Sequence, residues 1–339
     1  MPFNTSQHID RFLFRDLHPK VFMGTASDRY AGWIGQIYSQ KFADKITKRS
    51  NTVGGKSFTE EVLPVESVEE YFEHFRVLEL DYTFYSLLLN PDGKPTKTYH
   101  VLQSYAQHIP AGNFVILKVP QVIFAHKLFR GGKHIENKDY LNQEIFTRQF
   151  YKPAIEILGD TLRGLVFEQE YQRKNERVPV DEMAKSLDSF FQGIPKDDRY
   201  HIELRTESLL AEPVLRVLEK YGIGQVLSHW TWLPPLHRQF TMAGSRFLNS
   251  GGDCIFRLMT PIGMRYEDAY AKAHPFNAIV EGMLNPRMVE DTAGLMITAI
   301  DQGVSANIII NNRAGGNAPR IAQEVAKRFV ETERGAGKS

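Results

Sequence analysis

The chain has 339 residues, and its 41 Lys plus Arg nearly balance its 40 Asp plus Glu. No overall charge would therefore recruit nucleic acid or an anionic membrane surface, and any recognition of an anion must be local. Hydrophobic residues make up 42% of the chain and charged residues 24%, which is the balance of a globular protein with a sizeable core.

The single cysteine and the lack of long apolar runs narrow the class further. Cys254 alone excludes an internal disulfide framework and a cysteine-rich zinc site, and we expect a buried thiol in a protein of the reducing cytosol. Residues 1–20 carry several charged side chains and lack the apolar centre of a signal peptide. No stretch approaches the ~20 apolar residues of a membrane span. We therefore expect a cytoplasmic protein with neither a membrane nor a nucleic-acid partner.

In chain order, short apolar or β-branched segments predict eight strands, at 20–25, 77–84, 114–119, 164–167, 200–205, 224–229, 253–258 and 306–310. Several are almost continuously hydrophobic, which is typical of parallel strands covered on both faces. Helix-like segments lie between them, and both 209–221 and 321–329 carry an apolar stripe. Such alternation is typical of an α/β barrel or a doubly wound sheet, and the count and spacing favour a (β/α)8 TIM barrel, as one domain over residues 1–339.

Two connections are longer than a barrel needs. Residues 44–75 predict an insertion after the first strand, and residues 127–160 predict an enlarged connection after the third. Residues 331–339 are polar and contain glycine, so they predict a flexible C-terminal tail. The segments at 55–57 and 337–339 both read Gly-Lys-Ser, but neither has the upstream glycine of a phosphate-binding P-loop or follows an apolar strand. We interpret neither as a nucleotide site.

Polar side chains stand where the predicted strands end, which in a barrel is the mouth that carries catalytic residues. Residues two apart in a strand share a face, so we expect Glu79 and Asp81 to point the same way, as well as Glu203 and Arg205. The other polar residues at strand ends are Lys118, Glu168, Gln169, His229, Arg257, Asn311 and Asn312. They favour a functional mouth, although they could also pair with one another as a structural network, for example Glu203 with Arg205 or Arg257.

The segment after the eighth strand predicts an anion site. Asn317 is a candidate N-cap of the last helix, and Pro319 fits its first turn. We expect free backbone N–H groups beside Gly315 and Gly316 to face the mouth and bind an anion, with Arg257 adding donors from the adjacent strand. The alternative is an ordinary capped helix whose glycines only allow a turn.

These residues, in this order, resemble the YecE-like family, domain of unknown function 72. The resemblance rests on Gly24-Thr25-Ala26-Ser27 with Trp33, Gly35 and Tyr38, on residues 79–85, and on Lys118, His126, Phe167, Gln169, Glu203-Leu204-Arg205, Arg257, Asn311-Asn312 and Ala318. It extends from about residue 21 to about residue 329. It implies a TIM-type barrel with a pocket at its mouth, and no established activity.

The chain departs from the family pattern at three places. Asp81 stands where the family has Asn, and the segment 258–260 follows Arg257 where the family has a His-Gly pair. Ala26-Ser27-Asp28 replaces a Ser-Gly-Trp sequence after the first strand. We therefore expect a divergent member, whose chemistry need not follow any family reaction that depends on that His.

The leading functional hypothesis is an enzyme that acts on a small anionic or phosphorylated substrate by general acid/base chemistry. Lys118, Arg205 and Arg257 would stabilise negative charge. Glu79 or Glu203 would transfer protons, because apolar barrel walls can raise the pKa of a carboxyl group toward neutrality. The remaining candidates are His126 and His229 for proton transfer and Asp81, Tyr85, Trp33, Gln169, Asn311, Asn312, Gly315 and Gly316 for substrate binding.

Two alternatives belong to other classes. A divalent metal (Mg, Mn or Zn) held by Glu168, Glu203 and His229 would make an isomerase-like or hydrolase-like barrel, although nearby Lys and Arg side chains compete for these carboxylates. The second alternative is a non-catalytic protein that binds a metabolite or a partner. In it, residues 230–235, which are rich in Trp and Pro, would form a lid, an interface or a hydrophobic plug.

Overall fold

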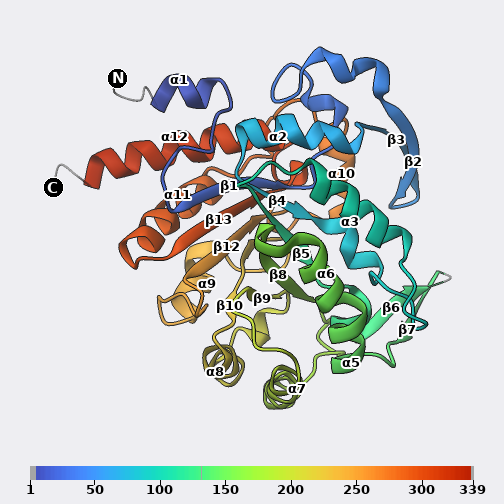
Figure 1. Cartoon of the computed structure of the whole chain (residues 1–339). Helices are drawn as coiled ribbons and strands as arrows, with labels where there is room; N and C mark the ends of the chain where they lie inside the picture. Colours follow the sequence, from blue (N-terminus) through green and yellow to red (C-terminus); the bar gives the residue numbers. More distant parts are fainter. Residues whose placement is uncertain (1–4, 131, 337–339) are drawn as a thin grey trace.

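The computed structural model describes residues 5–130 and 132–336, and within these ranges nine parallel strand segments form one sheet in the order β10-β9-β8-β5-β4-β1-β13-β12-β11. The segments are β1 (Val21–Ala26), β4 (Val77–Leu80), β5 (Phe114–Lys118), β8 (Leu162–Gln169), β9 (Tyr200–Leu204), β10 (Gly224–Gln225), β11 (Leu227–His229), β12 (Asp253–Leu258) and β13 (Ser305–Ile310). Figure 1 shows them at the centre of the molecule.

The two ends of this sheet belong to one interrupted strand. Only Val226 separates β10 from β11, and its N–H donates to the carbonyl of Ile202 in β9 at 2.8 Å. Because β10 pairs with β9 and β11 pairs with β12, the sheet comes round on itself as an eight-stranded barrel. The predicted barrel is therefore confirmed.

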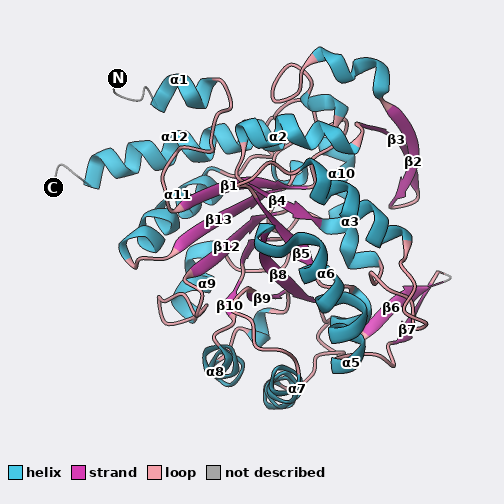
Figure 2. Ribbon diagram, viewed as in Figure 1, coloured by secondary structure: helices cyan, strands magenta, loops and turns pink. Residues whose placement is uncertain are grey.

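Helices surround the barrel (Figures 1 and 2). Those that connect the barrel strands or follow the last one are α2 (Val68–His74), α3 (Lys97–His108), α6 (Lys152–Leu158), α7 (Val180–Gly193), α8 (Glu212–Tyr221), α9 (Leu236–Met242), α11 (Pro286–Asp301) and α12 (Ala318–Ala336). The other α-helices of the described ranges are α1 (Thr5–Asp10), α4 (Gln121–Phe124), α5 (Gln143–Phe146) and α10 (Tyr266–Ala273). None of the helices in the described ranges is long and apolar enough to cross a membrane.

Alternation along the strands divides the core in two. One set of side chains points outward and packs under the helices, whereas the other fills the barrel with an apolar cluster of Phe22, Ala26, Val77, Ile116, Val166, Val226, Ile255, Met259 and Ile309. Cys254 lies on the outward-facing set and is buried, as expected, and burial raises the pKa of its thiol. The barrel interior is thus a packed support for residues at its mouth.

Both enlarged connections are present. An antiparallel hairpin, β2 (Thr47–Val53) and β3 (Lys56–Val62), lies between β1 and α2, and a second, β6 (Lys127–Arg130) and β7 (Lys133–Glu136), lies between β5 and α6. The first hairpin turns at Gly54 and Gly55, whose φ angles of +57° and +78° suit glycine in a two-residue turn. The Gly-Lys-Ser sequence at 55–57 therefore makes a hairpin turn, and its counterpart at 337–339 lies outside the described residues.

Most predicted strand boundaries differ from the structure by one or two residues, and three other differences are larger or affect the site. The second strand ends at Leu80, and residues 81–85 form a 3₁₀ helix, η4 (Asp81–Tyr85), because the hydroxyl of Thr83 donates to the carbonyls of Leu80 at 3.0 Å and Lys118 at 2.7 Å. The helix predicted at 209–221 begins at Glu212. Residues 331–336 of the predicted tail continue α12, and 337–339 lie outside the described residues, so flexibility there stays a prediction.

Candidate functional site

Six charged residues from the strand ends meet inside the barrel, and we call them the ion-pair layer: Glu79, Lys118, Glu168, Glu203, Arg205 and Arg257. Their side chains are 16% exposed or less. The three carboxylates balance the three cations in charge. Such a set can be stable without solvent only when each charge has close partners of opposite sign.

Arg257 is the centre of the ion-pair layer. Its Nη2 lies 2.7 Å from Glu79 Oε1, while Nη1 contacts Glu203 Oε2 and lies 3.3 Å from Glu168 Oε2. Burial alone would lower the pKa of the guanidinium, but these carboxylates raise it above its usual value. Arg257, which the sequence predicts as a donor to an anion, therefore binds Glu79 and Glu203 of the barrel instead.

Glu168 carries the densest set of contacts. Lys118 Nζ lies 2.5 Å from its Oε2, and Arg205 Nη1 lies 2.7 Å from its Oε1. Although burial opposes ionisation, the cations Arg205, Lys118 and Arg257 hold the pKa of Glu168 well below its usual range. Burial raises the pKa of Glu79, whose one direct ionic partner among residues 5–130 and 132–336 is Arg257. The layer thus joins five strands. Within it, Glu168 is held more strongly by cations than Glu79 is.

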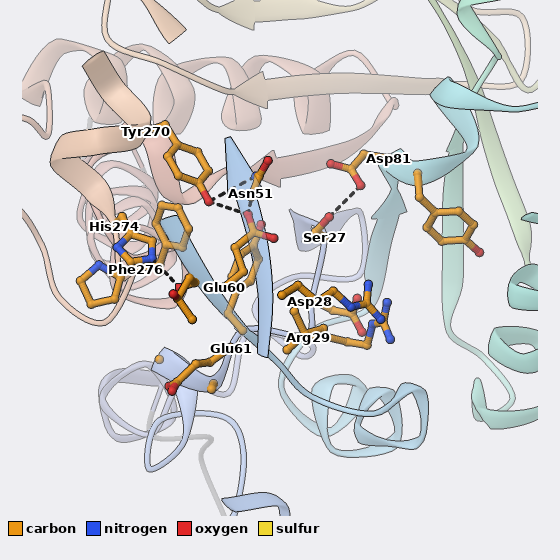
Figure 3. A pocket seen from close by; sticks show the side chains of 18 of the residues that line it. Ser27, Asp28, Arg29, Asn51, Glu60, Glu61, Asp81, Tyr270, His274 and Phe276 are labelled. Carbon is orange, nitrogen blue, oxygen red and sulfur yellow. Dashed lines mark hydrogen bonds between the residues drawn. The ribbon is translucent and has the colours of Figure 1, made fainter. Parts of the chain in front are cut away.

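A cavity of about 800 Å³ lies beside this layer, at the mouth, and we call it the lateral cavity. Its walls come from the segment after β1, from η4, from the β2–β3 hairpin, from the neighbourhood of α10 and from Arg313 after β13. Figure 3 shows Ser27, Asp28, Arg29 and Asp81 toward one side and Tyr270, His274 and Phe276 toward the other. Of the predicted site residues, only Asp81 and Tyr85 line this cavity.

Asp81 and Glu79 point into different spaces. Glu79 belongs to β4 and faces the ion-pair layer, whereas Asp81 begins η4 and lines the lateral cavity. The hydroxyl of Ser27 donates to Asp81 Oδ1 at 2.8 Å, which ties the end of β1 to the end of β4. The prediction that Glu79 and Asp81 share a strand face is wrong, because the strand ends at Leu80.

Asp28 is the most perturbed acid of the cavity. It is 2% exposed, and the hydroxyl of Tyr105 donates to its Oδ1 at 2.7 Å. Burial raises the pKa of Asp28 to about 6, and the nearby positive charge of Arg29 only partly offsets this effect. Its Oδ2 has no hydrogen-bond partner among the described residues. A carboxyl group with such a pKa can gain or lose a proton near neutral pH.

Two arginines bring positive charge to the cavity without a direct ion pair to a carboxylate in the described residues. Arg29 lies 5.8 Å from the ring centre of Tyr105, and Arg313 lies 4.5 Å from that of Tyr266. Within residues 5–130 and 132–336, neither forms an ion pair with a carboxylate at 4.0 Å or less, and Arg313 Nε is buried without a hydrogen-bond partner. These two guanidinium groups, unlike those of the ion-pair layer, are available to an anion.

The hairpin wall is held by polar contacts. The hydroxyl of Tyr270 in α10 donates to Glu60 Oε1, and Asn51 Nδ2 donates to the same oxygen at 2.8 Å. His274 Nε2 lies 3.0 Å from the carbonyl of Thr59 (Figure 3). These contacts fix the β2–β3 hairpin against α10, so the insertion after the first strand serves as a wall of the cavity.

The loop after β13 does not offer the predicted anion site. The carbonyl of Asn312 accepts from the N–H groups of Gly315 at 3.2 Å and Gly316 at 2.6 Å, and Asn312 Oδ1 accepts from the N–H of Ala318 at 2.8 Å. The expectation of free N–H groups is therefore wrong, because Asn312 satisfies them. Gly316 has a φ of +111°, and a Cβ there would lie 2.3 Å from the carbonyl oxygen of Ala278, so its role is close backbone packing.

Asn317 is the predicted N-cap, and this prediction is confirmed. Its Oδ1 accepts from the N–H of Arg320 at 2.9 Å, and its Nδ2 donates to the carbonyl of Phe276 at 2.8 Å. The side chain of Asn311 likewise accepts from the N–H of Arg313 at 3.0 Å. These asparagines shape the loop that carries Arg313 and the backbone next to the cavity.

The remaining sequence candidates have structural partners elsewhere. Trp33 is fully buried and donates from Nε1 to Asn312 Oδ1 at 3.2 Å, and Gln169 Oε1 accepts from the N–H of Arg205 at 3.2 Å. His126 stacks on Tyr140 at 3.8 Å between ring centres. None of these three lines the lateral cavity.

His229 and the alternative metal set are also separated. His229 alternates with Ser228 along β11 and faces away from the barrel interior, where burial lowers its pKa to about 4. Glu168 and Glu203 are bound by the cations of the ion-pair layer. In the part of the chain that the structure describes, no group of three or more His, Cys, Asp or Glu side chains is placed to hold a metal ion.

The aromatic segment after β11 forms part of the rim of the mouth. Trp230 lies under Arg205, with 4.9 Å between the guanidinium and the ring centre, and Trp232 stacks on Tyr171 at 5.6 Å. Leu233 is buried, whereas Trp232 is 44% exposed. The segment is thus partly a plug and partly an exposed surface.

Sequence reasoning missed most of the cavity. Asp28, Arg29 and Tyr30 follow the first strand directly, and Arg313 follows Asn311 and Asn312 after the eighth. The rule that strand ends carry the site would have found them, had it been extended a few residues beyond each strand. The tyrosines from α3 and α10 gave no such signal, because their nearness depends on the tertiary fold.

Comparison with known proteins agrees with this architecture. Two crystal structures of DUF72 family proteins are similar to the chain. The one from Enterococcus faecalis V583 has 15% identity and a TM-score of 0.53, with 91% of this chain and 95% of that chain covered. The one from Thermotoga maritima MSB8 has 16% identity and a TM-score of 0.52, with 92% and 99% covered. At such identities the likeness shows the fold alone.

No curated protein matches the chain. The family model described as "Protein of unknown function DUF72" matches residues 22–338. That range contains the barrel except Val21, the first residue of β1, together with the ion-pair layer and the lateral cavity. The resemblance seen in the sequence is confirmed, and the chain belongs to the DUF72 family.

Proposed function

We propose that the protein is an enzyme that acts on a small anionic substrate in the lateral cavity, by general acid/base chemistry. The observation that carries this proposal is the presence of Arg29 and Arg313, both without a carboxylate ion pair in the described ranges, in the same cavity as Asp28 and Asp81. A cavity of about 800 Å³ is of the size that holds small-molecule ligands.

The ion-pair layer is less suited to this task. Lys118, Arg205 and Arg257 already bind Glu79, Glu168 and Glu203. An anion that bound there would have to displace a carboxylate and leave it buried without its partner, which costs several kcal/mol. We therefore assign the layer to the support of the mouth and the binding of anions to Arg313, with Arg29 adding positive charge on the opposite wall.

The two carboxyl groups of the cavity have environments that suit different roles. Asp28, with a pKa of about 6, would act as the general acid. Asp81, which accepts a hydrogen bond from Ser27 at the end of β4, would act as the base. Binding a phosphate or carboxylate at Arg313 would place the rest of the substrate against Asp81. We also propose a cytoplasmic location, which the single, buried Cys254 supports.

Calorimetry with orthophosphate, pyrophosphate and citrate tests the anion site. We expect at least one of these to bind, and Arg313→Gln to weaken its binding about tenfold or more, because a charge-assisted contact contributes about 1.5–3 kcal/mol. Arg320→Gln removes the same charge from an exposed position of α12 and is the matched control, which should bind as the native protein does.

Turnover is tested with the anions that bind. Asp81→Asn should retain binding and lose turnover of a substrate found among phosphorylated metabolites. Equal loss of affinity in Arg313→Gln and Arg320→Gln would contradict the anion site. A different outcome is that the native protein binds an anion through Arg313 but turns over none of the phosphorylated metabolites. That result would favour a non-catalytic binding protein.

A further inference from the structure

We propose that the Asp28 side of the lateral cavity is a hydroxyl-binding subsite, so that the substrate is an anionic sugar or polyol. This inference rests on the proposed function, because it takes the anion site at Arg313 as given and identifies the group at the other side. It starts from two buried polar atoms that lack partners in the described part of the chain, Asp28 Oδ2 and the hydroxyl of Tyr82.

Asp28 is built to accept a hydrogen bond from a ligand. Its side chain is 2% exposed, and Tyr105 satisfies only one of its two oxygens. A carboxylate oxygen that is buried without a donor is costly, and native proteins rarely keep one without a reason. Asp28 lines the cavity, and a rotation of its side chain would bring that oxygen to a donor group of a bound molecule.

Tyr82 adds a group of the complementary kind. Its ring stacks on that of Tyr105, with 5.9 Å between the ring centres and 23° between the planes, and its hydroxyl is buried without a partner in the described residues. Tyr105, on which Tyr82 stacks, is also the residue that donates to Asp28, and Asp28 and Tyr82 line the same cavity. The subsite therefore offers an acceptor on Asp28 and a donor and acceptor on Tyr82.

A hydroxyl group fits this pair better than other polar groups do. An ionised phosphate only accepts hydrogen bonds, so Asp28 would repel it, and an ammonium group would meet the positive charge of Arg29 beside Asp28. A hydroxyl both donates and accepts, and it carries no charge. Neighbouring hydroxyls of a sugar or polyol could bind to Asp28 and Tyr82 together.

The other side of the cavity fits the anionic end of the same molecule. Arg313 lies over Tyr266, whereas Arg29 lies over Tyr105, so the two guanidinium groups stand on different walls. Asp81 also lines the cavity, and the hydroxyl that donates to it belongs to Ser27, the residue next to Asp28. A substrate that reached from Arg313 to Asp28 would therefore have both carboxyl groups of the proposed reaction beside it.

The test compares hydroxylated anions with an anion of similar size that has no hydroxyl groups. Glucose 6-phosphate, fructose 6-phosphate, ribose 5-phosphate and glucuronate are titrated by calorimetry against cyclohexylmethyl phosphate, which has a six-membered ring and a phosphate but no hydroxyl. We expect at least one hydroxylated anion to bind about tenfold or more tightly than cyclohexylmethyl phosphate, since one hydrogen bond to a charged group contributes that much.

Two variants then test which residues cause the tighter binding of hydroxylated anions. Asp28→Ala should reduce this preference to about threefold or less. Tyr82→Phe should reduce it in part without affecting folding, because the hydroxyl it removes has no partner among the described residues. Tyr140→Phe is the control, since it removes a buried hydroxyl whose contact is Met183, outside the cavity. If Asp28→Ala does not fold, Tyr82→Phe alone decides whether the hydroxyl-binding subsite exists.

The outcomes separate this inference from the function it rests on. If cyclohexylmethyl phosphate binds as tightly as every hydroxylated anion, and Arg313→Gln abolishes both, the anion site stands and the hydroxyl subsite is wrong. A hydroxyl preference that survives both Asp28→Ala and Tyr82→Phe also overturns the subsite. If no anion in the set binds in a way that depends on Arg313, the proposed function itself fails.

Discussion

Arg257 Nη2 lies 2.7 Å from Glu79 Oε1, and neither residue lines the lateral cavity. The strand-end residues that look most like catalytic groups in the sequence are therefore engaged with one another beneath the mouth. The groups left for a ligand come from the segments just beyond the strands, where Asp28, Arg29 and Arg313 lie.

Glu79→Gln and Glu168→Gln should differ in their cost to stability. Glu168 is held by three cations, so its loss leaves Lys118, Arg205 and Arg257 short of a partner and should cost about 3 kcal/mol or more. Glu79 has one direct ionic partner and a raised pKa, so Glu79→Gln should cost no more than about 1.5 kcal/mol. Urea denaturation at pH 7 measures both, and equal costs would contradict the assigned geometry.

The same two variants should respond to pH in opposite directions. The folded pKa of Glu168 is lowered, so the stability that its carboxylate contributes is present above its ordinary value of 4.5 and is lost as the pH falls below it. The folded pKa of Glu79 is raised, so its carboxylate costs stability as the pH rises above 4.5. The loss of unfolding free energy in Glu168→Gln should therefore become smaller below about pH 4.5. The unfolding free energy of Glu79→Gln, relative to that of the native protein, should instead be highest at higher pH. Denaturation curves between pH 4 and pH 8 test both trends.

Asp28→Asn should stabilise the protein above pH 6. The folded pKa of Asp28 is raised from 3.8 to about 6, so the ionised native side chain costs stability that grows between these values and then stays constant. At about 1.36 kcal/mol per pH unit the full effect is about 3 kcal/mol, and Asn keeps an acceptor for Tyr105. The gain should be near zero at pH 4 and largest at pH 7 to 8. A gain that does not change with pH would show that Asp28 has an ordinary pKa.

Asn317→Ala should destabilise the end of the barrel that supports Arg313. It removes the cap of α12 and a buried hydrogen bond to Phe276, which together should cost about 2–3 kcal/mol. Thermal unfolding measures the loss, and anion affinity at permissive temperature should fall as well, since the loop joins β13 to α12. Asn285→Ala removes the cap of α11, which is away from the cavity, and should lower stability without changing anion affinity.

The barrel could be predicted because its signal is local. The apolar segments 114–119 and 306–310 each read as a buried strand, and seven or eight such segments in alternation leave few folds to choose from. The predicted second strand is too long. The residue types from Val77 to Phe84 do not show that the hydroxyl of Thr83 binds the carbonyl of Leu80 and that the strand ends there. That one boundary decides whether Asp81 faces the ion-pair layer or the cavity.

The site could be predicted only in part, because pairing between distant residues is not visible in one sequence. Glu203 and Arg257 are 54 positions apart, and their contact was foreseen only as an alternative to function. Tyr105 and Asp28 come together across 77 positions, with no motif to join them. The N–H groups of Gly315 and Gly316 are another such case. The sequence does not show that they donate to the carbonyl of Asn312, so it predicts an anion site where none is free.

A crystal structure of the protein grown with inorganic phosphate tests the central claim most directly. We predict phosphate in the lateral cavity, bound by Arg313, with the ion-pair layer unchanged and Arg257 still bound to Glu79 and Glu203. Phosphate bound to Lys118, Arg205 or Arg257, with a carboxylate of the layer displaced, would contradict the assignment of the lateral cavity as the functional site.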